Sequence, residues 1–440
     1  MFHAIYVGST SACFELENRS AYYAPEAWQV QLDGMTVVCG DNNTGKSTAG
    51  KALVTLIELF NDLELKVIDA RKDKYHSLLF NKSRVSRLEG INPENEKILE
   101  RVMDGSLIGD ELTAIVKKTL PESDNSEYVQ SVVKRIMDAR VIPDAELKRQ
   151  IAFNRFYDVF RMQHLPLEGI ASGDTELVLD SQSRWIKIAF KRRHADSLPV
   201  LDGDMDMHRH AFFIDTPDVL DKINDYWYLL PDHRGDLNNL VINALYSQIE
   251  REQKNTNVID DYLVNAKIKG IYEKITSTIN GDSVVESEKL SFHEDDMRGN
   301  LEIANLSKGM KAFALLQLLL KEHVLQEEDM LVLDEPEIHL HPAWQVLYAE
   351  ILVLLQKSFN LTVLLTTHSS YFLEAIQLFS RKYQQEKSLH IYKSSVQSND
   401  GMATLTEVDT NATDIYASFM MPLDSLQDLR NELKEKGRNE

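Results

Sequence analysis

The chain has 440 residues, of which 43% are hydrophobic and 27% are charged, and these proportions exclude a disordered or fibrous protein. Its formal charge of −21 gives no overall attraction to nucleic acid, so contact with DNA would need a local basic patch. The sequence has no long apolar run, its first residues lack the pattern of a signal peptide, and its two cysteines, Cys13 and Cys39, lie in apolar surroundings typical of reduced thiols. We therefore expect a cytoplasmic protein without a membrane partner.

A glycine-containing loop, residues 40–48, follows a short apolar stretch, residues 35–39, that we predict to be a buried strand. The loop matches the phosphate-binding pattern G-x-x-x-x-G-K-[ST], and apolar residues then recur at helical spacing up to Phe60. In such a loop backbone N–H groups face phosphate oxygens, Lys46 neutralises their charge and the Ser47 hydroxyl binds Mg²⁺. The predicted phosphate-binding residues are Gly40, Asp41, Asn42, Asn43, Thr44, Gly45, Lys46, Ser47 and Thr48.

Residues 64–300 match no motif, and we predict that they form a large, mainly helical insertion in one continuous α/β domain. Seven prolines interrupt this segment, so a long coiled-coil arm does not fit. Residues 176–191 are typical of a β-hairpin, and a second hairpin is predicted from residues 284–293 and 301–306. The predicted boundaries are 1–63 and 301–395 for the two parts of the domain, 64–300 for the insertion, and 396–440 for a C-terminal strand and helix.

Acidic residues and histidines alternate along residues 202–210, so in an extended chain their side chains would share one face. Two interpretations are open, a metal or nuclease site and a solvated acidic loop. The calcium-loop pattern fails, because Met207 stands where glycine is required and Phe213 where a bidentate glutamate belongs. We favour the solvated loop for Asp202, Asp204, Asp206, His208 and His210.

Residues 305–311, N-L-S-K-G-M-K, precede an apolar segment that we predict to be helical from Ala312 to about Val324. Ser307 lies 27 residues before Asp334. The simplest interpretation is that Ser307 caps the helix by accepting a hydrogen bond from a free backbone N–H group. The alternative is that Ser307 and Gly309 contact a nucleotide.

The apolar residues 330–333 end at two carboxylates, Asp334 and Glu335, as expected where a central parallel strand meets a catalytic edge. Asp334 is placed to hold Mg²⁺, and Glu335 to orient and deprotonate an attacking water. A further strand at residues 361–365 leads to His368, which can donate a hydrogen bond to a γ-phosphate. A strand pair and a helix are predicted after it, at residues 389–392, 404–408 and 414–433.

The order of these elements resembles that of the ABC superfamily of ATPases, whose signature motif is L-S-x-G followed by a helix. The resemblance implies an α/β P-loop NTPase with an ABC-type head, ATP and Mg²⁺ as cofactors, and hydrolysis with Glu335 and His368 as catalytic residues. In that family the serine and glycine of the signature contact ATP bound by the opposite subunit. The resemblance therefore implies that Ser307 and Gly309 act across a homodimer or a higher homo-oligomer.

Two segments narrow the branch of the superfamily. Residues 334–342, DEPEIHLHP, and residues 366–370, TTHSS, resemble soluble SMC, RecF and OLD-type heads, especially the ATPase subunits of bacterial anti-phage systems such as Septu and PARIS. The resemblance implies a sensor or scaffold that controls a separate effector, a nuclease or toxin, because the 72 residues after His368 are too few for a fused Toprim nuclease domain. The alternative is a RecF- or SMC-like ATPase of DNA repair or maintenance, for which DNA is a possible partner.

Two further assignments follow from the same resemblance. His339 and His341 could belong to a metal cluster with neighbouring glutamates, but we favour packing of this loop at a dimer interface. ABC heads also use a glutamine that links magnesium to the insertion. Gln150 and Gln163 are both candidates, and neither lies in a recognisable motif.

Overall fold

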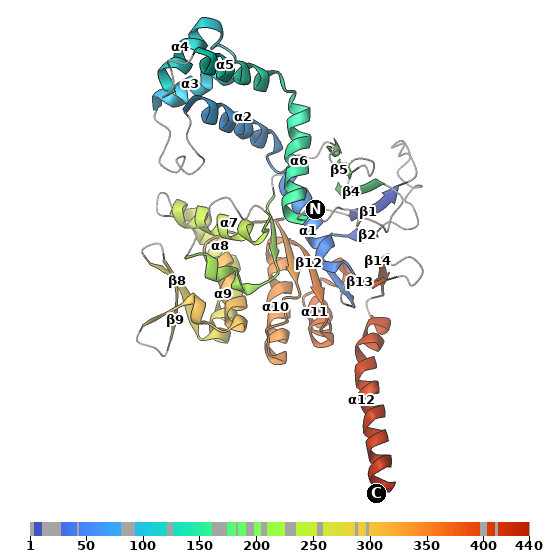
Figure 1. Cartoon of the computed structure of the whole chain (residues 1–440). Coiled ribbons are helices and arrows are strands. Elements are labelled where there is room, and N and C mark those ends of the chain that lie inside the picture. Colours follow the sequence, from blue (N-terminus) through green and yellow to red (C-terminus); the bar gives the residue numbers. More distant parts are fainter. Residues whose placement is uncertain are drawn as a thin grey trace. The chain divides into compact units, whose positions relative to one another are not determined.

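The computed structural model describes residues 4–10, 28–41, 44–80, 93–120, 126–160, 174–181, 184–190, 198–203, 209–224, 235–252, 258–286, 289–295, 299–396, 403–409 and 412–439. The chain forms two compact units. The head unit comprises Met1–Glu58 and Phe156–Glu440, and the helical unit comprises Leu59–Arg155. Figure 1 shows the elements of both units along the chain.

A six-stranded sheet forms the centre of the head unit. Five neighbouring strands run parallel, and the edge strand β14 pairs antiparallel with β13. The inner strands are apolar runs that are buried on both faces, as parallel sheets covered by helices require. The order across the sheet is β14 (Ala403–Val408), β13 (Leu389–Val396), β3 (Met35–Gly40), β12 (Thr362–Thr367), β11 (Met330–Asp334) and β7 (Ala211–Ile214).

Two antiparallel sheets accompany the main sheet. The larger one contains, in order, β2 (Trp28–Gln31), β1 (Ala4–Thr10), β4 (Asp174–Ser181), β5 (Arg184–Phe190) and β6 (Val200–Gly203). The smaller one contains β10 (Asn300–Glu302), β9 (Lys289–Glu294) and β8 (Gly281–Glu286). The predicted hairpin at residues 176–191 is confirmed by the pairing of β4 with β5, and the second predicted hairpin is part of the three-stranded sheet.

The helices of the head unit pack their apolar faces into one large core with the sheet. Phe313 of α9 makes edge-to-face contacts with Trp344 and Tyr348 of α10, which locks these two helices together. The short 3₁₀ helix η2 (Pro217–Lys222) follows β7. The α-helices are α1 (Lys46–Phe60), α7 (Asn238–Glu252), α8 (Val258–Ile279), α9 (Lys308–Lys321), α10 (Pro342–Phe359), α11 (Ser370–Lys382) and α12 (Thr413–Asn439).

The helical unit has a separate core of aliphatic side chains with Tyr75. Arg71 ties its helices together, because the guanidinium donates to the carbonyl oxygens of Ala139 (2.9 Å) and Ile142 and pairs with Asp144 at 2.6 Å. The chain enters and leaves the unit within α1 and α6. Its elements are α2 (Leu63–Phe80), α3 (Pro93–Met103), α4 (Gly109–Thr119), α5 (Ser126–Val141) and most of α6 (Asp144–Phe160).

The structure divides the chain differently from the boundaries expected for an insertion at residues 64–300. Only residues 59–155 form a separate unit, whereas β7 (Ala211–Ile214), which lies in the expected insertion, pairs with β11 inside the main sheet. The run Ala-Phe-Phe-Ile is only four residues long, so no periodicity distinguishes it from a buried loop. Within the described ranges, none of the helices is long and apolar enough to span a membrane.

Candidate nucleotide-binding site

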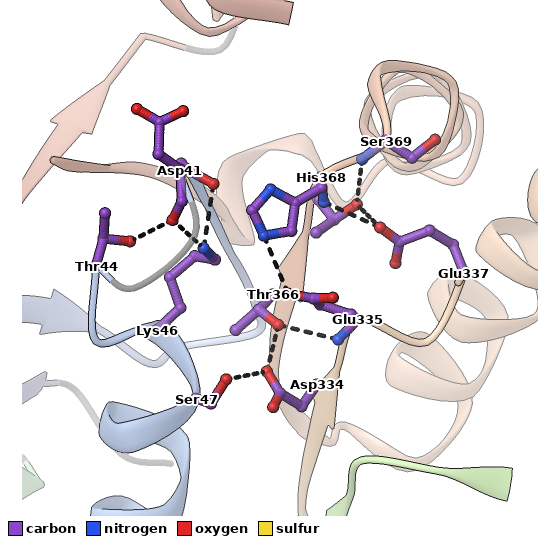
Figure 2. A network of polar contacts seen from close by, with 12 residues as sticks. Asp41, Thr44, Lys46, Ser47, Asp334, Glu335, Glu337, Thr366, His368 and Ser369 are labelled. Carbon is purple, nitrogen blue, oxygen red and sulfur yellow. Dashed lines mark hydrogen bonds and ion pairs between the residues drawn. The ribbon is translucent and has the colours of Figure 1, made fainter. Parts of the chain in front are cut away.

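The predicted phosphate loop connects β3 to α1 (Figure 2). Gly40 has a φ of +152°, and a Cβ atom built there would lie 2.2 Å from the carbonyl oxygen of Ser394. Any larger residue would therefore push the loop away from β13. The hydroxyl of Ser394 donates to the carbonyl oxygen of Thr44 at 3.0 Å, which holds the loop against the neighbouring strand.

Lys46 is the first residue of α1, and its side chain is buried. The ammonium donates to the carbonyl oxygens of Gly40 (3.1 Å) and Asp41 (2.6 Å), as Figure 2 shows for the latter. Burial lowers the pKa of Lys46, and the nearby carboxylates of Glu335 and Asp334 oppose this effect. A buried cation held by neutral carbonyls at a helix N-terminus fits an anionic ligand, since phosphate oxygens would compensate its desolvation.

Ser47, Asp334 and Thr366 bring three oxygen-bearing side chains together from three elements. Oδ1 of Asp334 accepts hydrogen bonds from Ser47 Oγ at 3.0 Å and from Thr366 Oγ1 at 2.6 Å. These residues lie at the start of α1 and at the ends of β11 and β12. Hydroxyl and carboxylate oxygens are the ligands that Mg²⁺ prefers, so Ser47 and Asp334 fit the metal that was predicted for them.

Glu335 follows β11 in the left-handed region, with a φ of +51°. Its backbone N–H is held by the carbonyl oxygen (3.2 Å) and the hydroxyl (3.0 Å) of Thr366. This conformation costs on the order of 1 to 3 kcal/mol in a non-glycine residue and is typical of functional sites. It turns the side chain toward His368, whose Nε2 lies 3.0 Å from Glu335 Oε1 (Figure 2).

The signature residues Ser307 and Gly309 lie at the N-terminus of α9. The hydroxyl of Ser307 caps this helix by accepting a hydrogen bond from Met310 N at 3.2 Å. The space beside Gly309 is tight, because a Cβ atom would lie 3.2 Å from both the carbonyl oxygen of His339 and the ring of Trp344. The neighbours of these two residues thus lie in α9, in the loop after β11 and at the start of α10.

Two lysines beside the signature are fixed by 3₁₀ helix η2. The amine of Lys308 lies 2.7 Å from Asp218, and the buried amine of Lys311 lies 2.8 Å from Asp221. Burial alone would raise the pKa of Asp218, but hydrogen bonding and attraction from Lys308 keep it below its usual value. These pairs anchor the start of α9 to the segment that follows β7.

The remaining predicted loop residues have different surroundings. Thr44 is buried and its hydroxyl donates to the carbonyl oxygen of Asp41 at 2.8 Å, whereas Thr48 is exposed on α1. Gly45 has a φ of +80°, which the tight turn into α1 requires. Asn42 and Asn43 lie outside the described residues.

Sequence reasoning missed three polar residues that organise this site. Thr366 binds Asp334 and the backbone of Glu335, and Thr367 binds the buried side chain of Glu337 at 2.5 Å. The threonines of the T-T-H sequence were the available signal, since threonine pairs at the end of an apolar strand are well suited to bind carboxylates. The contact of Glu337 with Thr367 could not be predicted, because the sequence around a loop glutamate does not indicate which strand its side chain contacts.

Several other predictions concern metals and thiols. Asp202 and His210 are exposed, and Asp204, Asp206 and His208 lie outside the described residues. In the described part of the chain no group of three or more His, Cys, Asp and Glu residues is arranged to hold a metal. Cys39 is a free thiol in β3 whose pKa burial raises to about 12, and Cys13 lies outside the described residues.

The remaining sequence predictions concern the two histidines after β11 and the two candidate glutamines. His341 caps α10 by accepting a hydrogen bond from Ala343 N at 3.3 Å, and His339 is exposed. Gln150 is exposed on α6 in the helical unit and donates to Asn154 at 2.9 Å. Gln163 lies outside the described residues.

Comparisons with known proteins add a family and a set of structures. Residues 214–374 match the family model described as "AAA domain, putative AbiEii toxin, Type IV TA system". Similar solved structures include an SMC head bound to the C-winged helix domain of ScpA (12% identity, TM-score 0.46, 93% of this chain and 97% of that chain). The SMC head domain from Thermotoga maritima has 11% identity and a TM-score of 0.39, over 93% and 99% of the two chains. The Smc head domain from Pyrococcus furiosus with an extended coiled coil has 11% identity and a TM-score of 0.42, over 98% and 99%. No curated protein matches the chain.

The parallel sheet, the phosphate loop between β3 and α1, and the paired carboxylates after β11 define the class of protein. The match of residues 214–374 to an AAA-domain family agrees with it. The chain therefore has the α/β fold of a P-loop ATPase with an ABC-type head and much helical structure, and the predicted fold class is confirmed.

Proposed function

We propose that the chain is an Mg²⁺-dependent ATPase that works as a dimer and controls a separate effector, a nuclease or toxin, in defence against phage. The observation that carries the ATPase activity is the meeting of five side chains from two strand ends and one helix N-terminus, namely Lys46, Ser47, Asp334, Glu335 and His368 (Figure 2). This is the set of charges and oxygen ligands that phosphoryl transfer to water requires.

Each of these residues has a role that follows from its position. Lys46 binds phosphate oxygens, and Ser47 with Asp334 holds Mg²⁺. When bound, Mg²⁺ neutralises charge that develops on the phosphate oxygens. Glu335 accepts the proton of the attacking water, and His368, at 3.0 Å from its carboxylate, keeps it oriented and donates to the γ-phosphate.

The dimer is supported by the position of the signature and by exposed apolar side chains near the site. Ser307 and Gly309 contact their own α9 and the loop after β11, so a nucleotide that they touch is best supplied by a second copy. Ile338, Val346 and Tyr371 are exposed in that loop and at the starts of α10 and α11. Exposed apolar side chains are typical of an interface when they form one patch, and we propose that these three do so.

The link to defence is supported by two observations. The family whose model matches residues 214–374 is described with a toxin and a type IV toxin–antitoxin system. The segment from Asp334 to Pro342 also resembles ATPase subunits of anti-phage systems. The resemblance to these ATPase subunits implies that the partner is a separate effector protein. ATP turnover would determine whether the effector is held or released.

The test has a biochemical and a cellular arm. Lys46→Ala should lose ATP affinity in a nucleotide titration, and unchanged affinity would show that the phosphate-loop assignment is wrong. Cells that express the chain with the product of its adjacent gene should resist phage, and Glu335→Gln should change that resistance. Equal plaque counts for wild type, Glu335→Gln and empty vector would contradict the defence role while leaving the ATPase assignment intact.

A further inference from the structure

Glu337 lies in the loop after β11, with its side chain buried against the end of β12 (Figure 2). One oxygen, Oε1, accepts two hydrogen bonds, from Thr367 Oγ1 at 2.5 Å and from the backbone N–H of His368 at 3.0 Å. The other oxygen, Oε2, is buried and has no hydrogen-bond partner among the described residues. The contacts of this carboxylate therefore all go to the residues that precede and include the histidine.

The residues at and just after the end of β12 contact the carboxylates at the end of β11 and in the loop that follows it. Thr366 binds Asp334 at 2.6 Å, Thr367 binds Glu337 at 2.5 Å, and His368 lies 3.0 Å from Glu335. Three consecutive residues thus each engage a different carboxylate. The first contact fixes the Mg²⁺ ligand and the third orients the base, which leaves the second without a chemical role of its own.

We propose that Glu337 is a positioning residue that holds the backbone of His368, and through it the pair formed by His368 and Glu335, in place for hydrolysis. This inference rests on the proposed roles of those two residues. Glu337 touches neither the attacking water nor the phosphates in this scheme. It acts by fixing the main chain from which the imidazole projects, and a misplacement of about 1 Å can lower turnover by on the order of a hundredfold.

The same residue connects the pair to the exposed part of the loop. The carbonyl oxygen of Glu337 accepts from Leu340 N at 2.9 Å, and Gln345 donates to the carbonyl oxygen of Leu340 at 3.1 Å. Ser369, directly after His368, donates to Gln345 at 2.6 Å. Between these fixed points lie the exposed residues 338 and 339, so a second copy that contacts them would act on the histidine through a rigid frame.

The chemistry of the contact predicts which substitutions are tolerated. Burial raises the pKa of Glu337, and a neutral carboxylic acid still offers its carbonyl oxygen as an acceptor. Because both hydrogen bonds use Oε1 alone, a glutamine amide oxygen can replace it, whereas alanine removes the acceptor altogether. A residue that serves as a base or as a metal ligand would not tolerate glutamine.

The experiment compares Glu337→Gln with Glu337→Ala in the full chain, with ATP affinity and turnover measured separately. We expect Glu337→Gln to stay within about threefold of wild type and Glu337→Ala to lose on the order of tenfold or more in kcat, with ATP affinity within about twofold. Glu350→Ala is the matched control, since it removes another buried hydrogen-bonded glutamate of the head unit. It should lower thermal stability but not kcat at 25 °C. Equal losses for Gln and Ala at position 337, or equal losses for Ala at 337 and 350, would overturn the proposal.

A second readout does not depend on turnover. In protein labelled at histidine, the imidazole signal of His368, assigned by its absence in His368→Ala, should shift when Glu335→Gln is introduced. In the Glu337→Ala background that shift should shrink, and in the Glu337→Gln background it should persist. If the shift is the same in all three backgrounds, Glu337 does not position the pair. If Glu335→Gln retains full turnover while the shifts behave as expected, the proposed base is wrong but the positioning role stands.

Discussion

The head unit and the helical unit differ in where they keep charge. Residues 59–155 contain 17 Lys and Arg and 17 Asp and Glu, so the helical unit is neutral and the whole charge of −21 lies in the head unit. Among the described residues, every buried Lys, Asp and Glu also belongs to the head unit, namely Lys46, Lys311, Glu322, Asp329, Glu337 and Glu350. The core of the helical unit is apolar, and its ion pairs lie at the surface.

This difference shows how each unit can change. A buried charged group lowers the stability of the fold unless it is paired, so the head unit should tolerate few substitutions at these positions. Its motifs can therefore be recognised in the sequence. An apolar core with surface ion pairs depends on volume and pattern rather than on particular residues. The helical unit is thus the part that can diverge without loss of the ATPase site, which agrees with the absence of any motif in it.

The largest effect that we expect from a substitution in the charged site of the head unit is the loss of turnover in Glu335→Gln. The substitution keeps the size of the side chain but removes the base, so hydrolysis should fall by on the order of a hundredfold or more while ATP still binds. Steady-state phosphate release and a nucleotide titration measure the two effects. The control is Glu302→Gln on exposed β10, which should behave as wild type. Turnover within about twofold of wild type in Glu335→Gln would remove Glu335 from the role of base.

The next effect concerns Ser307, whose proposed ligand belongs to a second copy. Ser307→Arg should leave ATP binding nearly intact but prevent closure and hydrolysis, because the larger cation would occupy the cap of α9. Lys46→Ala should fail for the opposite reason. A mixture of the two inactive proteins should recover part of the activity, since a mixed dimer has one intact site, with Lys46 from one protein and Ser307 from the other.

The recovery should grow with total protein concentration, because the composite site exists only in the associated species. Sizing of the mixture with ATP identifies the conditions under which mixed dimers form. Absence of recovery under those conditions would rule out the shared site. Full activity of Ser307→Arg by itself would show that each subunit works alone.

The parts of this molecule that could be predicted from sequence are those whose geometry is local. The phosphate loop, the strand that ends at Asp334 and the signature helix each need only a short contiguous pattern, and the structure has a strand or helix in each place. The contacts of Glu337 with Thr367 and of Lys311 with Asp221 join segments 30 or more residues apart. Periodicity does not report such pairings, and neither does it show that residues 211–214 lie beside β11.

A third prediction concerns Glu350, which lies buried between three helices of the head unit. Burial alone would raise its pKa, but hydrogen bonds from Lys274, Tyr383 and Lys382 lower it to about 2. Because the folded pKa is below the unfolded value, the stabilisation is complete above about pH 4.5 and is lost as the pH falls toward 2. Glu350→Gln should lower the free energy of unfolding by on the order of 2 kcal/mol at pH 7.

Urea unfolding at several pH values measures this effect. The difference between wild type and Glu350→Gln should shrink as the pH falls from about 4.5 toward 2, since Glu350 of the unfolded chain is protonated in this range before the folded carboxylate is. Glu386→Gln, whose partner Arg381 lies at 4.0 Å on the surface, is the control and should change stability little at any pH. A difference that stays constant with pH would mean that Glu350 stabilises the head unit by packing rather than by charge.

The smallest effect tests whether the two units are energetically separate. Arg71→Ala removes the contacts of α2 with Ala139, Ile142 and Asp144, and should cost about 1 kcal/mol, because Asp144 is exposed and the pair is screened by solvent. Amide exchange should accelerate in α2, α5 and α6 but not in the six-stranded sheet. The neighbouring Lys72→Ala, whose pair with Glu96 is exposed at 3.6 Å, should leave exchange unchanged. The opposite result would be that Arg71→Ala lowers ATP turnover tenfold and leaves amide exchange in the helical unit unaltered. The helical unit would then take part in the ATPase cycle, and its lack of net charge would not mean that it is independent of the ATPase site.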